Sequence, residues 1–191
     1  MGTKLERIME ISATKPKPEF TSLYHLINVE MLKRCHKELD GSKAVGIDKV
    51  SKAEYEEQLE ENLTNLVSKL KNKAYKPLPS LRVFIPKANG KKRPLGIASY
   101  EDKIVQLAVK KILEAIYEPR FLNCMYGFRP NRGCHDAIKE VHTQLSNGHI
   151  NHVVDADIKG FFDHLSHEWM MEFLKLYIKD PNLLWLINKR S

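Results

Sequence analysis

Two aspartates near the end of the chain have a residue type and a spacing that suit a catalytic or metal-binding site. In residues 152–158 (HVVDADI), the period-two alternation of a strand puts Asp155 and Asp157 on one face and the apolar side chains on the other. Two carboxylates on one face need a compensating charge. A hard divalent cation, shared with a substrate phosphate, is a common solution. The pattern therefore indicates phosphoryl transfer.

The residues that follow fit the same chemistry, but they also have a plain structural explanation. Gly160 permits close backbone approach, and an exposed ring at Phe161 or Phe162 could lie against a nucleotide sugar. Alternatively, Asp155 and Asp163 are turn or cap acids, and the two phenylalanines belong to the core. This segment alone favours the structural explanation, so the rest of the sequence has to decide.

A basic hairpin is predicted well before these aspartates. Residues 71–100 contain eight lysines and arginines and no acidic residue. The strand-like runs 81–85 and 91–97 flank Asn89-Gly90, a dipeptide that tolerates the positive φ angles of a tight turn. Pro86 and Pro94 restrict both strands to edge positions or force bulges.

Helices are predicted on both sides of the hairpin. The capping box of Ser51 and Glu54 predicts a helix start, because leucines follow on one face. Apolar spacing predicts further helices over residues 19–39, 102–117, 135–145, 166–177 and 183–187.

An irregular loop is predicted at residues 126–133 (YGFRPNRG). Its glycine, proline and asparagine residues oppose regular structure, and its arginines and aromatic rings remain available for ligands. The Gly46-Ile47-Asp48 segment is interpreted as a turn or cap, not as a catalytic element.

Composition excludes several classes of protein. With 191 residues and 42% hydrophobic content, the chain can bury a real core, and its net charge of +7 favours nucleic acid as a partner. Cys35, Cys124 and Cys134 form no C-x-x-C pair, so neither a disulfide framework nor a cysteine zinc site is indicated. The eight histidines show no metal-binding pattern. No export signal or membrane span is recognisable, and we expect a soluble protein of the bacterial cytoplasm.

Three motifs occur in order along the chain. They are IPKANGKKRPLGI at 85–97, YGFRPNRGCHDAI at 126–138 and DADIKGFFD at 155–163. Together they resemble the reverse transcriptases encoded by bacterial and organellar group II introns, which also act as maturases. The resemblance runs from Gly46 almost to the end of the chain. Diversity-generating, retron and CRISPR-associated reverse transcriptases share the general plan, but they usually match the G-F-R-P loop less closely.

The resemblance implies a role for each matching residue. In this family the first metal-binding aspartate lies five residues before an aromatic that blocks the ribose 2′-hydroxyl, which selects Asp157 and Phe162 and leaves Asp155 secondary. The backbone carbonyl of Ile158 would be a further metal ligand. Two Mg²⁺ ions would activate the primer 3′-hydroxyl and stabilise the pyrophosphate leaving group.

The hairpin would supply the cations that a triphosphate needs. Lys87 and Arg93 match the phosphate-binding pair of the family, while Lys91 and Lys92 lie nearer the hairpin tip. The residues expected to contact template or other RNA are Arg129, Arg132, Lys91 and Lys92.

The implied fold is α+β, with the right-hand plan of polymerases. It would comprise a helical N-terminal extension (1–41), fingers (42–150) and the first part of a palm (151–191). The fingers would include the hairpin 81–97, the helix 102–118 and the loop 126–133.

The family completes its site with a [Y/F]-A-D-D turn, and this chain contains no Asp-Asp pair. We therefore expect a piece of a longer enzyme that is catalytically incomplete alone. Its partners would be intron RNA as template, a DNA primer and deoxynucleoside triphosphates, with splicing assistance, retrohoming and a homodimer also implied.

A second hypothesis is a non-catalytic module that binds intron RNA. It would use the basic residues near the amino terminus, which include Lys4, Arg7, Lys15 and Lys17.

Overall fold

The long helix α5 (Tyr100–Tyr117) forms the centre of the fold. The computed structural model describes residues 3–86, 90–148 and 150–189. Ser99 caps α5 by accepting a hydrogen bond from the Asp102 amide, and the predicted apolar face of the helix is fully buried at Ile104, Ile112 and Ile116. The prediction that this helix is deeply packed is confirmed.

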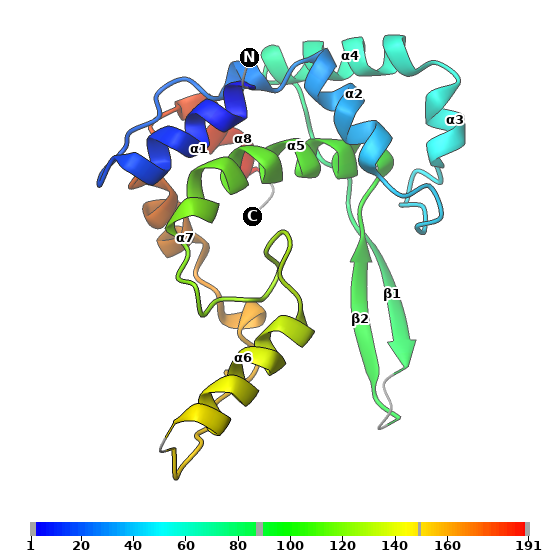
Figure 1. Ribbon diagram of the computed structural model, residues 1–191. Helices are drawn as coiled ribbons and strands as arrows, with labels where there is room; N and C mark the ends of the chain where they lie inside the picture. Colours follow the sequence, from blue (N-terminus) through cyan, green and yellow to red (C-terminus); the bar gives the residue numbers. More distant parts are fainter. Residues whose placement is uncertain (1–2, 87–89, 149, 190–191) are drawn as a thin grey trace.

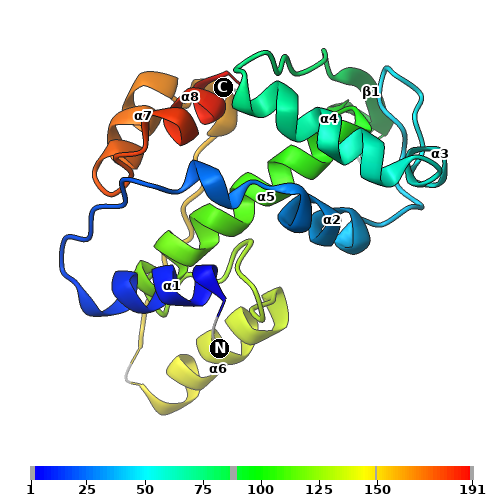
Figure 2. The same ribbon diagram turned by 90° about the horizontal axis from the view of Figure 1, so that it is seen from above.

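The first helices cover one side of α5 (Figures 1 and 2). Helices α1 (Lys4–Thr14) and α2 (Val29–Glu38) both contact α5, and α4 (Leu59–Lys71) packs against α2. A buried hydroxyl fixes α1, since Ser12 donates to the Ile116 carbonyl at 2.5 Å. The residues assigned to an N-terminal extension therefore share one core with those assigned to the fingers, and the predicted domain boundaries stay predictions.

The helix predicted over residues 19–39 is wrong in its first half. The structure has only a 3₁₀ turn, η1 (Tyr24–Leu26), before α2 begins after its cap Asn28. The backbone N–H groups of Leu23 and Tyr24 donate to the Asp180 carboxylate, and Phe20 forms a parallel β-bridge with Ile178. These tertiary contacts override the helical periodicity of the apolar residues.

The capping box predicted at Ser51 and Glu54 is confirmed at the start of α3 (Lys52–Glu56). The helix is interrupted before α4, because Gln58 adopts φ −126° and ψ 40°, and the Asn62 side chain donates a hydrogen bond to the Tyr55 carbonyl across the interruption. Leu63, Leu66 and Leu70 then bury the predicted leucine face.

The predicted hairpin is confirmed as β1 (Leu81–Pro86) and β2 (Lys92–Ile97), an antiparallel pair that projects away from the helices (Figure 1). Both strands are edges, as their prolines require. The hairpin is anchored at its base, since Asp102 on α5 accepts hydrogen bonds from the Tyr75 hydroxyl and from the Leu78 amide.

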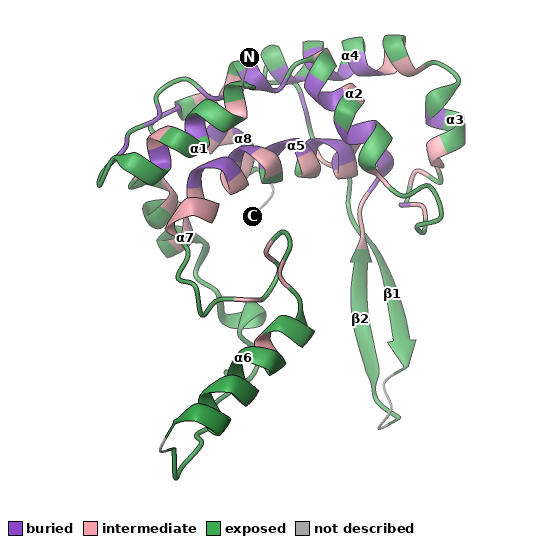
Figure 3. Cartoon of the chain, in the orientation of Figure 1, coloured by how far each residue is buried: buried purple, intermediate pink, exposed green. Residues whose placement is uncertain are grey.

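The last part of the chain leaves the helical layer and returns to it. After η2 (Glu118–Arg120), a loop leads to α6 (Cys134–Asn147), and η3 (Phe162–His164) precedes α7 (His167–Lys175) and α8 (Pro181–Asn188). The predicted helices at 135–145, 166–177 and 183–187 are thus confirmed. Figure 3 shows that α6 and the hairpin are almost wholly exposed, while buried residues concentrate on α5 and the helices around it.

The strand predicted over residues 153–158 is wrong. The segment is irregular and exposed, and Val154 keeps 90% of its surface in solvent. A strand needs a neighbouring strand to satisfy its N–H and C=O groups. In the part of the chain that the structure describes, the hairpin is the only sheet, so residues 153–158 have no ladder to join.

The architecture is thus a mainly helical unit with one small antiparallel sheet, compatible with the α+β class. Within residues 3–86, 90–148 and 150–189, no helix combines the length and apolar character that crossing a bilayer requires.

Candidate functional site

The segment with Asp157 connects α6 to η3 along the surface. Asp155, Asp157 and Ile158 are all exposed. Directly after them the chain turns at Gly160, whose φ of +64° suits glycine and whose carbonyl accepts from the amides of Asp163 and His164 at 3.0 and 3.2 Å.

This turn sets the two phenylalanines edge to face. The ring centroids of Phe161 and Phe162 are 5.5 Å apart at an interplanar angle of 71°. Phe162 has 78% of its surface exposed to solvent, so its ring is accessible to a ligand. The alternative that both phenylalanines are core residues is therefore wrong for the described structure.

The donor set for a divalent metal is small. Across the described ranges, no group of three or more histidine, cysteine, aspartate or glutamate side chains lies close enough to hold a metal ion. Asp157 and the Ile158 carbonyl would be two ligands of one ion, whereas a pair of magnesium ions requires several carboxylates. The described residues therefore do not fit a two-magnesium site by themselves.

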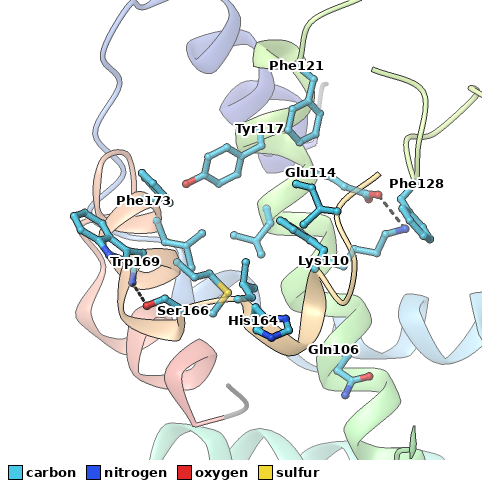
Figure 4. A pocket seen from close by; sticks show the side chains of 16 residues that line it. Gln106, Lys110, Glu114, Tyr117, Phe121, Phe128, His164, Ser166, Trp169 and Phe173 are labelled. Atoms are coloured by element: carbon cyan, nitrogen blue, oxygen red, sulfur yellow. Dashed lines mark hydrogen bonds and ion pairs between the residues drawn. The ribbon is translucent and has the colours of Figure 1, made fainter. Parts of the chain in front are cut away.

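An apolar groove of about 940 Å³ lies beside this segment, between α5, the loop after η2 and α7 (Figure 4). Its wall includes Ile158 and Phe161 from the candidate segment, and Trp169 and Phe173 from α7. Tyr117 also faces the groove, and burial raises the pKa of its hydroxyl to about 12.

Arg129 in the predicted loop is turned inward. Its Nε and Nη2 atoms donate to the Glu118 carboxylate at 2.9 and 2.8 Å, and its Nη1 donates to the carbonyls of Leu122 and Met125. The guanidinium also lies over the Phe121 ring, and the side chain is only 8% exposed.

Arg132 has partners within the loop as well. Its Nη1 donates to the Asn123 carbonyl at 2.5 Å, and its guanidinium lies 5.3 Å from the Tyr126 ring centroid. The template contacts predicted for Arg129 and Arg132 stay predictions, but the structure already assigns both side chains to holding the loop.

The predicted phosphate-binding cations lie on the hairpin of β1 and β2. Arg93 pairs with Ile85 and Lys92 with Pro86 in the hairpin register, and Lys91, Lys92 and Arg93 are exposed. Lys87 lies outside the described residues. Figures 1 and 2 show the hairpin and the link between α6 and α7 on opposite sides of the molecule, so the structure does not bring these cations against Asp157.

Sequence reasoning missed Glu118 and the almost complete exposure of Phe128, whose ring it interpreted only as shaping the loop or as available for a ligand. Glu118 lies 11 positions before its partner Arg129, beyond the range of any local helix or turn signal. Phe128 follows a glycine and precedes Arg129-Pro130, and this turn-rich setting could have indicated that its side chain projects.

Comparison with known proteins gives a consistent result. Residues 85–189 match the family model described as reverse transcriptase (RNA-dependent DNA polymerase). The chain is 36% identical over 187 residues to the group II intron-encoded protein LtrA of Lactococcus lactis, which covers 97% of this chain and 31% of LtrA. It is 38% identical over 152 residues to protein YkfC of Escherichia coli, covering 78% of this chain and 40% of YkfC.

A more distant similarity extends to plants. Nuclear intron maturase 1 of Arabidopsis thaliana is 30% identical over 88 residues, or 46% of this chain. The resemblance drawn from the three motifs is confirmed, and the chain spans about a third of the length of LtrA.

Proposed function

The chain belongs to the reverse transcriptase family of RNA-dependent DNA polymerases, of the group II intron-encoded kind, and we propose that a whole protein carrying it copies intron RNA into DNA and assists splicing. The observation that carries this proposal is the family match over residues 85–189, which runs from the end of β1 through β2, the G-F-R-P loop and the Asp157 segment. The chain alone is proposed to be inactive, because it contains no Asp-Asp pair to complete the metal site.

In this proposal Asp157 and the Ile158 carbonyl contribute to a magnesium site whose other ligands lie outside the described residues. Magnesium in a polymerase activates the primer 3′-hydroxyl and stabilises the pyrophosphate leaving group. The exposure of the Asp157 segment supports this role, because its carboxylate remains accessible. No reaction step is assigned to this chain by itself.

Phe162 would stand beside the sugar of the incoming nucleotide. Its 78% exposure and its edge-to-face contact with Phe161 support this role, since the neighbour limits the directions in which the ring can turn. The hairpin cations Lys87, Lys91, Lys92 and Arg93 would bind triphosphate or nucleic-acid backbone, which requires the hairpin arm to move toward the Asp157 segment or the substrate to bridge the two.

The proposed partners are intron RNA, a DNA primer and deoxynucleoside triphosphates, in the bacterial cytoplasm. The proposal retains the division into extension (1–41), fingers (42–150) and partial palm (151–191). A homodimer through the exposed apolar surface around α6 and α7 is also proposed.

The decisive experiment is Asp157→Asn in the whole protein. Complementary DNA synthesis on an intron RNA template should be lost, while RNA affinity should stay close to wild type, because the change removes a metal ligand and no cation. Asp155→Asn is the matched control and should reduce synthesis much less. Undiminished synthesis by the Asp157 variant would end the proposal.

A non-catalytic RNA-binding function is the second candidate. It is favoured by the exposed basic residues on and after α1, which are Lys4, Arg7, Lys15 and Lys17. Neutralising all four should weaken intron RNA binding and flatten its salt dependence. Unchanged affinity and unchanged salt slope would remove this candidate and leave the polymerase proposal intact.

A further inference from the structure

Phe128 adopts a backbone conformation that a bulky residue rarely takes. Its φ is +57°, and its side chain is 99% exposed. A left-handed conformation costs a non-glycine residue about 1–3 kcal/mol and persists only where the surroundings impose it. Here the result is a phenyl ring held outside the fold.

The surroundings that impose this conformation are the internal bonds of Arg129. Its Nε, Nη1 and Nη2 atoms are all used, by Glu118 from η2 and by the carbonyls of Leu122 and Met125. Arg129 is thus clamped inward with 8% exposure, while the ring of the preceding Phe128 points outward. The loop is therefore built with its arginine inside and its aromatic ring outside.

Phe128 differs from the other exposed apolar residues of this region. Ile138, Val141 and Leu145 are exposed at helical spacing on α6, the pattern of a face that packs against further protein. Phe128 instead lies on an irregular loop, where no periodic face continues it, and it is the most exposed apolar residue of that loop, at 99% against 67% for Leu122. Single projecting aromatic rings of this kind serve as stacking surfaces for unpaired bases.

The ring also has the right location. Phe128 lines the same groove as Ile158 and Phe161 of the candidate segment, and Figure 4 shows it at the groove edge near the Lys110–Glu114 ion pair of α5. A base stacked on Phe128 would therefore lie close to the residues proposed to receive the nucleotide.

We propose that Phe128 is a stacking platform for an unpaired base of the nucleic-acid template, and that Arg129 positions Phe128 and does not itself contact the template. This inference rests on the proposed polymerase function. A stacking surface suits a template reader, because every base has a π face and stacking tolerates any sequence. The basic charge of the chain supplies the general attraction for the strand.

The first test compares Phe128→Ala with Phe128→Trp in the whole protein. Removing the ring should weaken single-stranded template binding by roughly 5- to 150-fold, and the tryptophan variant should bind like wild type. A template with 2-aminopurine at successive positions should show quenching at one position, which the alanine variant abolishes. Unchanged affinity and unchanged quenching in Phe128→Ala would overturn the proposal.

Parallel measurements separate the possible failures. If Asp157→Asn loses synthesis while Phe128→Ala binds template normally, the stacking role fails and the polymerase function stands. If Asp157→Asn retains synthesis, the polymerase function fails. If Phe128→Ala lowers the unfolding temperature but leaves template affinity unchanged, the ring packs against protein and the stacking role is wrong.

The second test asks whether Arg129 acts through Phe128. Arg129→Gln should weaken template binding without changing the slope of log K against log salt, since no phosphate contact is lost. The double variant with Phe128→Ala should bind no worse than Phe128→Ala alone. A slope smaller by about 1 in Arg129→Gln, or additive losses in the double variant, would show a direct template contact and overturn the positioning role.

Discussion

Replacing Asp180 with alanine should destabilise the whole helical unit. The carboxylate is 3% exposed and accepts four backbone hydrogen bonds. Two come from Leu23 and Tyr24 at 2.6 and 2.7 Å, and two come from Asn182 and Leu183 at 2.9 and 3.2 Å. One side chain thus caps α8 and fixes the segment before α2.

The expected loss follows from these contacts. Removing a helix N-cap costs about 1 kcal/mol, and each buried N–H left without an acceptor costs about 1–3 kcal/mol. Because Tyr24 is only half-buried, we expect Asp180→Ala to lower the free energy of unfolding by about 3–5 kcal/mol, out of the 5–15 kcal/mol typical of a domain.

The same bonds predict a pH dependence. Burial alone would raise the pKa of the Asp180 carboxyl, but the four N–H donors hold its pKa below the ordinary value of 3.8. A carboxyl with a depressed pKa in the folded state stabilises the fold fully above its unfolded pKa, and this stabilisation is lost as pH falls through the folded pKa. Wild type should therefore lose stability below about pH 4, and Asp180→Asn should lose less.

Urea unfolding followed by circular dichroism, at pH 7 and at several lower values, measures both effects. Asp40→Asn is the control at pH 7, because its exposed carboxylate has only nearby surface partners, Ser42 by hydrogen bonds and Lys43 by an ion pair, and it should unfold close to wild type. If Asp180→Ala unfolds within about 1 kcal/mol of wild type, the bonds to Asp180 do not stabilise the fold as reasoned here.

Two further predictions concern the contacts around the start of α5. Gly46→Ala should lower the free energy of unfolding by about 1–3 kcal/mol in urea titrations, because a Cβ would lie 2.6 Å from the Ser99 Cα. Gly127→Ala, with nothing within 4 Å of its Cβ, is the matched control, and equal losses in both would refute the steric argument. Burial of the His36 ring lowers its pKa below 6.5, with Glu56 opposing and Lys52 adding to the shift, so wild type should lose stability as pH falls below about 6.5. This loss of stability at low pH should disappear in His36→Gln. A His36→Gln variant with the pH profile of wild type would contradict the prediction.

Local signals predict much of this fold because they act locally. The Ser51 and Glu54 capping box, the apolar face of α5 and the strand-like runs of the hairpin each depend on neighbours within a few positions. These elements are found where the sequence predicts them. Long-range contacts set the exceptions, as at residues 20–27, where Asp180 prevents a helix that the apolar spacing favours.

Less of the candidate site than of the fold could be predicted from the sequence. The motifs locate Asp157 and Phe162, but the strand predicted there needs a partner strand that the described residues do not supply. Arginine in a G-F-R-P loop suggests a ligand contact, but in the structure Nη2 of Arg129 lies 2.8 Å from Oε1 of Glu118. Whether a cation faces a ligand or a buried acid depends on such distant partners.

The β-bridge between Phe20 and Ile178 has a consequence for biosynthesis. A ribosome releases the amino terminus first, yet the amide of Leu23 finds its acceptor 157 positions later. Helices α1 and α2 must wait, incompletely packed, until the segment around Asp180 has emerged. When these two segments meet, the long stretch of chain between them becomes a closed loop. The entropic cost of closing a loop rises only slowly with its length. The segment between residues 121 and 166 therefore leaves the helical unit, and the regions before and after this segment complete that unit.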